Sequence, residues 1–107
     1  MRNEKVFRYL GLAAKAGKVA SGEFQTENAL KKGRAGVVLI ADDASGNTKK
    51  KFADMCSFRG VPYFMIADKA ALGHQIGKEM RSSAAVTDEN LANAIINTMR
   101  ETFPEND

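Results

Sequence analysis

Several kinds of residue are scarce in this chain, and each shortage excludes a class of protein. Of its 107 residues one is a cysteine, Cys56, one is a histidine, His74, and none is a tryptophan. A single cysteine cannot form an internal disulfide, and neither residue has neighbours at the spacing of a zinc site. We therefore expect a protein without disulfides, bound metal or any other cofactor.

Long apolar segments are also lacking. No apolar run approaches the roughly 18 residues that a transmembrane helix needs, and the polar beginning MRNEKVFRYL has no stretch like that of a secretory signal. The hydrophobic fraction of 44% and the charged fraction of 27% are ordinary for a globular protein. These features predict a cytoplasmic protein without membrane partners, folded as one domain over residues 1–107 with a disordered tail from about 104 to 107.

Positive charge is concentrated in the first third of the chain. Residues 1–34 contain eight Lys and Arg against three Glu, whereas residues 88–107 contain one Arg against five acidic residues. The net charge of +3 therefore combines a cationic body with an acidic C-terminal segment. A cationic surface attracts polyanions such as RNA, and a merely solvated lysine surface is the alternative interpretation.

Apolar periodicity and turn residues divide the chain into alternating helices and strands. The predicted helices cover residues 3–16, 22–33, 48–58, 69–77 and a last segment that Asp88 caps, and the predicted strands cover residues 18–21, 36–41, 61–66 and 83–87. The apolar runs in 36–41 and 61–66 are typical of buried strands, which need helices above and below the sheet. The alternation predicts an α/β fold, a three-layer α/β/α sandwich with a central sheet of about four strands, mixed if the segment 18–21 joins it.

The predicted helix over residues 22–33 carries the most informative surface. At 100° per residue, one side of it consists of residues that should pack inward: Thr26, Ala29, Leu30 and Gly33. The opposite side and its edge carry an aromatic ring, amides and lysines: Phe24, Gln25, Asn28, Lys31 and Lys32. An exposed ring in this company can stack on a base beside phosphate contacts, whereas a ring folded under a neighbouring loop would only pack.

The start of the same helix favours an anionic ligand. Gly22 lets another backbone approach closely, and free amide groups at a helix N-terminus bind phosphate. The segment lacks the Gly-Lys-Ser or Gly-Lys-Thr ending of the phosphate loop in nucleotide hydrolases, so a loop of that kind is not predicted.

The segment GEFQTENALKKG, residues 22–33, resembles the strand-to-helix RNA motif of the kink-turn-binding ribosomal-protein superfamily. Three later blocks keep that family's order and spacing: IADDA at residues 40–44, VPY at 61–63, and Leu72-Gly73 with Gly77. The segment DASGNTKK at residues 43–50 is most similar to the bacterial YlxQ-type branch. The resemblance spans about residues 3–98 and implies the same fold together with RNA binding.

The resemblance also implies a set of RNA-contacting residues. The helix start would read the tandem sheared G·A pairs of a kink-turn, and a loop before the last strand would cover a flipped-out base. The set comprises Gly22, Phe24, Gln25, Asn28, Lys31, Lys32, Lys69, Met80, Arg81 and Ser82. The family pattern reads Gly-x-Asn-Glu-x-x-Lys and begins here at Gly22. This chain has Phe24 in place of the Asn, Gln25 in place of the Glu and Asn28 in place of the Lys. Phe24 can make no hydrogen bond to a base edge, whereas Gln25 can donate and accept.

Other candidate sites fit structural roles better. Asp42 and Asp43 are expected in a turn, Cys56 as a small hydrophobe in the core, and His74 as an ordinary surface or partly buried residue. The lysine run at residues 49–51 is either a solvated face or an extension of an RNA track. An enzyme is therefore not expected.

Together these features predict an RNA-binding accessory protein, acting as a monomer, that recognises a kink-turn or related structure in ribosomal RNA or an mRNA leader, in association with the ribosome. A protein-interaction module that keeps the fold and has lost the RNA site is the alternative, since fold does not dictate function. Steep salt dependence of binding would favour RNA, and weak salt dependence would favour an aromatic anchor for a protein.

Overall fold

The structure of the chain, a computed structural model, describes residues 2–102. Its elements in chain order are α1 (Arg2–Lys15), β1 (Val19–Ser21), α2 (Glu23–Lys31), β2 (Val37–Ile40), α3 (Gly46–Arg59), β3 (Tyr63–Met65), α4 (Lys69–Gln75), β4 (Ser83–Val86) and α5 (Glu89–Thr102). The predicted alternation of helices and strands is confirmed. The tail predicted at 104–107 lies outside the described residues.

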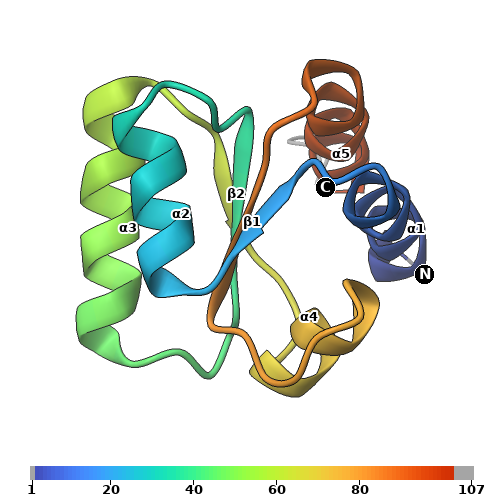
Figure 1. Cartoon of the computed structure of the whole chain (residues 1–107), viewed down its shortest axis with the longest axis horizontal. Helices are drawn as coiled ribbons and strands as arrows, with labels where there is room; N and C mark the ends of the chain where they lie inside the picture. The colour runs from blue at the N-terminus through green and yellow to red at the C-terminus, as the bar shows by residue number, and fades with distance from the viewer. Residues whose placement is uncertain (1, 103–107) are drawn as a thin grey trace.

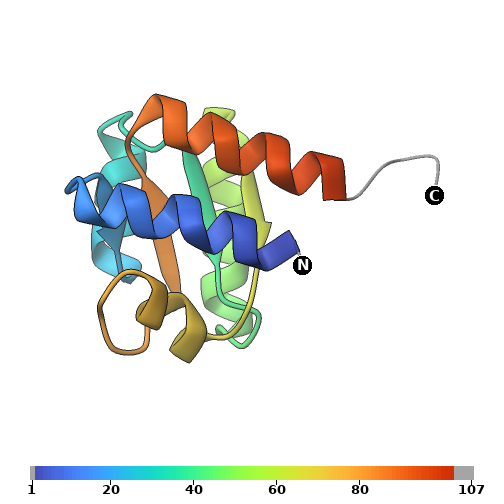
Figure 2. The ribbon, with the colours of Figure 1, turned by 90° about the vertical axis from the view of Figure 1, so that its right-hand side faces the viewer.

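The elements form three layers around one sheet. The strand order is β1-β4-β2-β3, in which β2 runs parallel to β3 and β4 runs antiparallel to both of its neighbours. Helices α2 and α3 cover one face, and α1, α4 and α5 lie on the other (Figure 1). Figure 2 shows α1 and α5 side by side across that second face. The predicted α/β/α sandwich with a mixed sheet is confirmed, and the short β1 joins the sheet beside β4.

The two middle strands form the centre of the core. Every residue of β2 and β4 is buried, as predicted for the run in 36–41. The prediction of a second buried strand over 61–66 is wrong, because β3 covers Tyr63–Met65 at the sheet edge and is only partly covered. Pro62 fits this edge position: it has no N–H to donate, and its carbonyl accepts a hydrogen bond from the Val38 N–H at 3.0 Å.

Polar side chains set where three helices begin. The Ser45 hydroxyl accepts a hydrogen bond from the Thr48 N–H at 3.1 Å, so α3 begins at Gly46, earlier than predicted. The carboxylates of Asp68 and Asp88 accept hydrogen bonds from backbone N–H groups at 2.8 Å in each case, which confirms both predicted caps.

A glycine ends α2 and turns the chain sharply. Gly33 has φ +71°, and the N–H groups of Gly33 and Arg34 donate to the carbonyls of Leu30 and Ala29 at 3.1 and 2.9 Å. This pairing is a Schellman motif, in which glycine adopts the left-handed conformation at little cost. Gly33 is the predicted helix stop, but it is exposed rather than on the inward side. The turn leaves Arg34 beside the last turn of α2.

Cys56 provides a test of the core. Its side chain is fully buried, and burial raises the pKa of the Cys56 thiol from 9.0 to about 11. Because the thiolate is the reactive form, we expect the native protein to resist iodoacetamide at pH 8 and to react rapidly in guanidinium, as followed by intact-mass spectrometry. Equal alkylation rates for native and denatured protein would contradict this packing.

Candidate nucleic-acid interface

Two buried hydroxyl groups fix the orientation of α2 on the sheet. Ser83 on β4 donates its hydroxyl hydrogen to the Thr26 hydroxyl oxygen at 3.0 Å, and Thr26 donates to the Ala20 carbonyl on β1 at 3.4 Å. Thr26 and Ser83 are both fully buried. Thr26, Ala29 and Leu30 therefore face inward as predicted, and the opposite side of α2 faces outward.

The junction between β1 and α2 requires glycine for its backbone conformation. Gly22 has φ +90° and ψ 163°, a combination that side chains oppose, and its N–H donates to the Ser83 carbonyl at 2.8 Å. A Cβ there would meet only the Arg81 Cδ at 3.9 Å. Crowding within the chain is thus not the reason for glycine here. No side chain caps α2, so its first-turn N–H groups point outward without a side-chain acceptor.

Phe24 projects from this first turn. Its ring is 75% exposed, which confirms the predicted exposure and contradicts the alternative of a ring tucked under a loop. Gln25 is exposed and Asn28 is half-buried on the same outward side. An aromatic ring and two amides therefore lie together beside the start of the helix.

Hydrogen bonds bring distant loops to the same end of the sheet. The Arg81 side chain donates through Nε to the Ser21 hydroxyl at 3.3 Å, and its backbone N–H donates to the Lys69 carbonyl at 3.1 Å. The Lys69 N–H in turn donates to the Asp43 carboxylate at 2.9 Å. Gly22, Lys69 and Arg81, which are far apart in the sequence, are thus neighbours at the start of α2.

The loop before β4 is tied down on both sides of Arg81. Met80 is 59% exposed, and its carbonyl accepts a hydrogen bond from the Arg81 guanidinium at 2.9 Å. The Ser82 carbonyl accepts from the Ala41 N–H at 2.8 Å. The loop also packs closely on α4 at Gly73. The approach is so close that a Cβ on Gly73 would lie 1.5 Å from the Glu79 carbonyl oxygen. The loop therefore presents the Met80 side chain outward from a fixed backbone.

The side of α2 that faces α3 carries charges that compensate one another. Lys51 on α3 pairs with Glu23 at 3.2 Å and also with Glu27, and Lys31 pairs with Glu27 at 2.9 Å. Hydrogen bonds from Lys51 and Lys31 lower the pKa of Glu27, and the bond to Glu27 raises the pKa of Lys51. Lys50 pairs with Asp54 at 3.0 Å. Lys31 and most of the lysine run therefore already have acidic partners.

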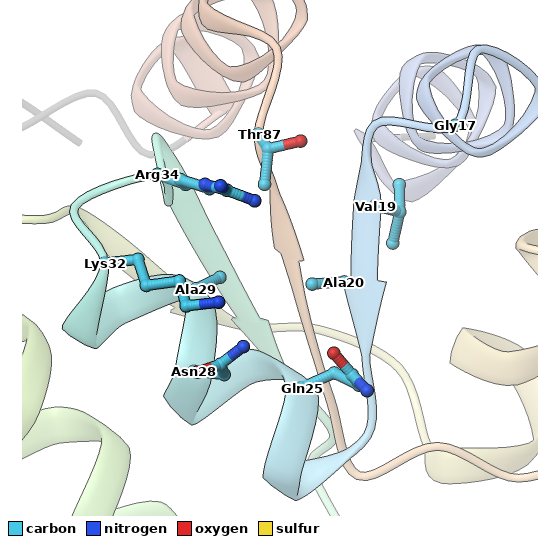
Figure 3. A pocket seen from close by; sticks show the side chains of 9 residues that line it. All are labelled: Gly17, Val19, Ala20, Gln25, Asn28, Ala29, Lys32, Arg34 and Thr87. Atoms are coloured by element: carbon cyan, nitrogen blue, oxygen red, sulfur yellow. The ribbon is translucent and has the colours of Figure 1, made fainter.

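The side of α2 that faces β1 is different. A pocket of about 180 Å³ lies between α2 and β1 (Figure 3), and its polar lining consists of Gln25, Asn28, Lys32, Arg34 and Thr87. We call these five residues the basic pocket. Figure 3 shows the side chains of Lys32, Asn28 and Arg34 converging on the space beside β1. The sequence did not indicate Arg34 or Thr87 as residues of this pocket. For Arg34 the local clue was Gly33, because a glycine turn at the end of α2 directs the next residue back beside the helix.

Neither a metal site nor a membrane segment emerges from the described part of the chain. Within it, no three His, Cys, Asp or Glu side chains gather closely enough to hold a metal ion. Likewise, none of the helices between residues 2 and 102 has the length and apolar character needed to cross a bilayer. His74 is exposed on α4 and lies outside both polar surfaces of α2.

Comparison with known families gives one match over most of the chain. Residues 4–96 match the model of the "Ribosomal protein L7Ae/L30e/S12e/Gadd45 family". The "RNA-binding protein YlxQ" of Bacillus subtilis (strain 168) is 45% identical over 93 residues, covering 87% of this chain and 93% of that protein. The protein of the same name from Enterococcus faecium is 40% identical over 75 residues, covering 70% and 73% of the two chains.

Two solved structures share the fold. A protein with unknown function from Bacillus halodurans C superposes with a TM-score of 0.85 at 32% identity, covering 89% of this chain and 96% of that one. The Giardia lamblia 15.5kD RNA binding protein superposes with a TM-score of 0.80 at 22% identity, covering 91% and 83%. At that lower identity the second comparison speaks for the fold alone.

Gly73 tests how the loop before β4 is held. Because an added methyl would overlap the Glu79 carbonyl, we expect Gly73→Ala to lower the free energy of unfolding by at least about 1 to 3 kcal/mol, as overpacking does. Gly46→Ala is the matched control, since nothing lies within 4 Å of its Cβ position, and it should be neutral or stabilising by up to about 1 kcal/mol. Urea unfolding curves measure both, and equal midpoints for the two variants would show that the close contact does not exist.

Proposed function

The chain belongs to the ribosomal protein L7Ae/L30e/S12e/Gadd45 family, and from this premise we propose that it binds structured RNA through the start of α2 and the loop at residues 80–82. The YlxQ relatives carry the name RNA-binding protein, and they match most of this chain. The observation that carries the proposal is the exposed Phe24 ring beside an uncapped helix start and the Arg81 loop. Aromatic stacking, directed N–H donors and a guanidinium are the groups that hold unpaired bases and phosphates.

The chemistry of the surface favours RNA that is folded and exposes bases. A-form helices hide most base edges from side chains, so proteins read RNA sequence mainly in loops, bulges and kinks. Phe24 supplies a face on which a splayed base can stack, and the exposed Met80 side chain supplies a second apolar contact from the opposite loop. A kink-turn or related motif has such bases, and we propose that class of RNA as the ligand.

The proposed setting follows from the family. Relatives named for RNA binding and a family named for ribosomal proteins make RNA rather than a metabolite the expected partner, and a binding role rather than catalysis the expected activity. We propose that the protein acts as a monomer in the cytoplasm, in association with the ribosome or with a structured mRNA leader.

Replacing Phe24 tests the stacking contact directly. We expect Phe24→Ala to weaken binding to a kink-turn RNA by about 5- to 150-fold, the range for loss of one stacked base. Phe58→Ala is the matched control, because Phe58 is 84% exposed at the far end of α3 and should not affect binding. Fluorescence anisotropy at several salt concentrations measures both variants.

The same titrations separate RNA binding from the alternative of a protein-interaction module. The parent protein should show a steep linear fall of log affinity with log salt. Equal loss of RNA affinity in Phe24→Ala and Phe58→Ala, or no binding by the parent, would count against the proposal.

Restoring the family pattern tests the specificity for a kink-turn. The triple variant Phe24→Asn, Gln25→Glu and Asn28→Lys keeps the net charge, because the added Glu and Lys cancel. We expect it to prefer a kink-turn with intact G·A pairs over one with those pairs disrupted more strongly than the parent does, by roughly 1 to 3 kcal/mol per restored base contact. If the parent and the triple variant distinguish intact from disrupted G·A pairs equally well, the kink-turn does not bind at residues 24, 25 and 28.

A further inference from the structure

We propose that the basic pocket between α2 and β1 binds one ribose-phosphate unit of the RNA. Lys32 and Arg34 would contact the phosphate, and the amide and hydroxyl side chains of the pocket would contact the sugar or a base edge. The inference rests on the proposed function and extends the RNA-binding surface from the start of α2 along the helix to its end. It assigns a role to Arg34 and Thr87, which the family motif does not contain.

The charge of the pocket is uncompensated. No Asp or Glu lines it, and neither Lys32 nor Arg34 forms an ion pair with any residue in the described range 2–102. The cations on the opposite side of α2 behave differently, because Lys31 and Lys51 are held by Glu27. A polyanion that lies along α2 therefore gains more from the β1 side, where it displaces no acidic partner.

The neutral side chains of the pocket also have free hydrogen-bonding capacity. Gln25, Asn28 and Thr87 make no side-chain hydrogen bond to the part of the protein that the structure describes. An amide both donates and accepts, and a hydroxyl does the same. A ribose-phosphate unit has hydroxyl donors and phosphate and ring-oxygen acceptors that match this mixture.

The position at the end of a helix works against an anion, but weakly. The C-terminus of a helix carries the equivalent of about half a negative charge. In α2 the last carbonyls already accept hydrogen bonds: Ala29 from the Arg34 N–H, and Leu30 from the Gly33 N–H and from Arg59 Nε at 3.0 Å. Two full positive charges on Lys32 and Arg34 outweigh this residual dipole.

One acidic residue follows the pocket in sequence. Asp88 comes directly after Thr87, and its carboxylate accepts a hydrogen bond from the Leu91 N–H at 2.8 Å at the start of α5. A carboxylate at a helix N-terminus is stabilised there by the positive end of the dipole, which offsets part of its charge. Asp88 is therefore committed to capping α5 and does not line the pocket.

The size of the pocket favours one unit of a larger ligand. Its volume of about 180 Å³ is about six times the roughly 30 Å³ that a water molecule takes up in the liquid. It is smaller than the roughly 300 Å³ at which pockets for free small molecules begin. The pocket thus has room for a sugar with its phosphate but little more, as expected where most of the ligand lies outside.

The pocket is continuous with the stacking surface. Asn28 lines both the basic pocket and a shallow hollow of about 80 Å³ beside Phe24. Residues 23 and 32 are nine steps apart on a helix that rises 1.5 Å per residue, so about 14 Å separates the helix start from Lys32. A strand with one base on Phe24 would reach Lys32 and Arg34 within a few nucleotides.

The test compares charge-neutralising variants of the full chain on one structured RNA. We expect Arg34→Gln and Lys32→Gln each to weaken binding about 10-fold, the size of a hydrogen bond to a charged group. Each should also reduce the slope of log affinity against log salt by about 0.7 to 0.9, the value for one lost phosphate contact. Lys50→Gln removes the same charge from a lysine already paired with Asp54, and it should leave affinity and slope near the parent values.

The outcomes separate this inference from the proposed function. If Arg34→Gln keeps the affinity and the salt slope of the parent while Phe24→Ala binds RNA more weakly, the proposed subsite is wrong. RNA binding at the helix start would then still stand. Equal effects of Arg34→Gln and Lys50→Gln would reduce the pocket to general surface charge and would also overturn it. A parent that binds no structured RNA would remove the proposed function, and the subsite with it.

A free nucleotide shares the same chemistry, and a second measurement distinguishes that source. We expect AMP and inorganic phosphate, titrated into labelled protein and followed by NMR, to shift the Arg34 and Thr87 backbone signals only at concentrations far above the dissociation constant for RNA. Saturation by AMP at concentrations as low as those for RNA would identify a small-molecule site and overturn the RNA subsite.

Discussion

The buried hydroxyl pair of Thr26 and Ser83 determines what the protein can present to a ligand. These two side chains form a buried hydrogen bond between α2 and β4, and Thr26 also donates to the Ala20 carbonyl on β1. Burying a hydroxyl without a partner would cost roughly 1 to 3 kcal/mol, so α2 cannot rotate on the sheet without losing both hydrogen bonds. Because the orientation of α2 about its own axis is fixed in this way, Phe24, Gln25 and Asn28 face outward.

With that rotation fixed, α2 separates two electrostatic environments. On the side that faces α3, Lys51 pairs with Glu23 and Glu27, and Lys31 pairs with Glu27. The pairs of Lys51 connect the two helices, and together these ion pairs leave little uncompensated charge between them. Toward β1, the edge strand of the sheet carries no acidic residue. Lys32 and Arg34, which line the basic pocket on this side, form no ion pair with any of residues 2–102. On the proposed binding surface, the direction in which RNA crosses α2 would thus be set by the neighbouring secondary structure rather than by the helix sequence.

The layers and the exposed Phe24 could be predicted from the sequence because they depend on periodicity that one element carries by itself. The mixed sheet could be predicted only on the condition that the segment 18–21 joins it, because strand direction depends on pairing between elements. The misjudged features depend on contacts between elements. The edge position of β3 follows from which strand pairs with β2, and the ion pairs of Lys51 with Glu23 and Glu27 depend on α3 packing beside α2. The Lys31–Glu27 pair is different, because it lies four residues apart within one helix and is a local pattern. Arg34 and Thr87 meet only because the α2–β2 turn and the end of β4 lie at the same end of the sheet. No local pattern contains that information.

If the start of α2 binds RNA as proposed, the exchange of Asn, Glu and Lys in the family pattern for Phe24, Gln25 and Asn28 should change the kind of recognition more than its strength. The family's Glu and Lys cancel in charge, so their loss leaves the long-range attraction for RNA unchanged. That attraction acts over a screening length of about 8 to 10 Å and can come from any cation near the helix, including Lys32 at its C-cap and Arg34 after the Gly33 turn. Base-edge hydrogen bonds act only at contact, and a ring cannot replace the directed polar groups that make them. On the proposed surface, affinity for folded RNA would therefore persist, and the choice among RNAs would depend on base stacking and on the geometry of the RNA backbone along α2.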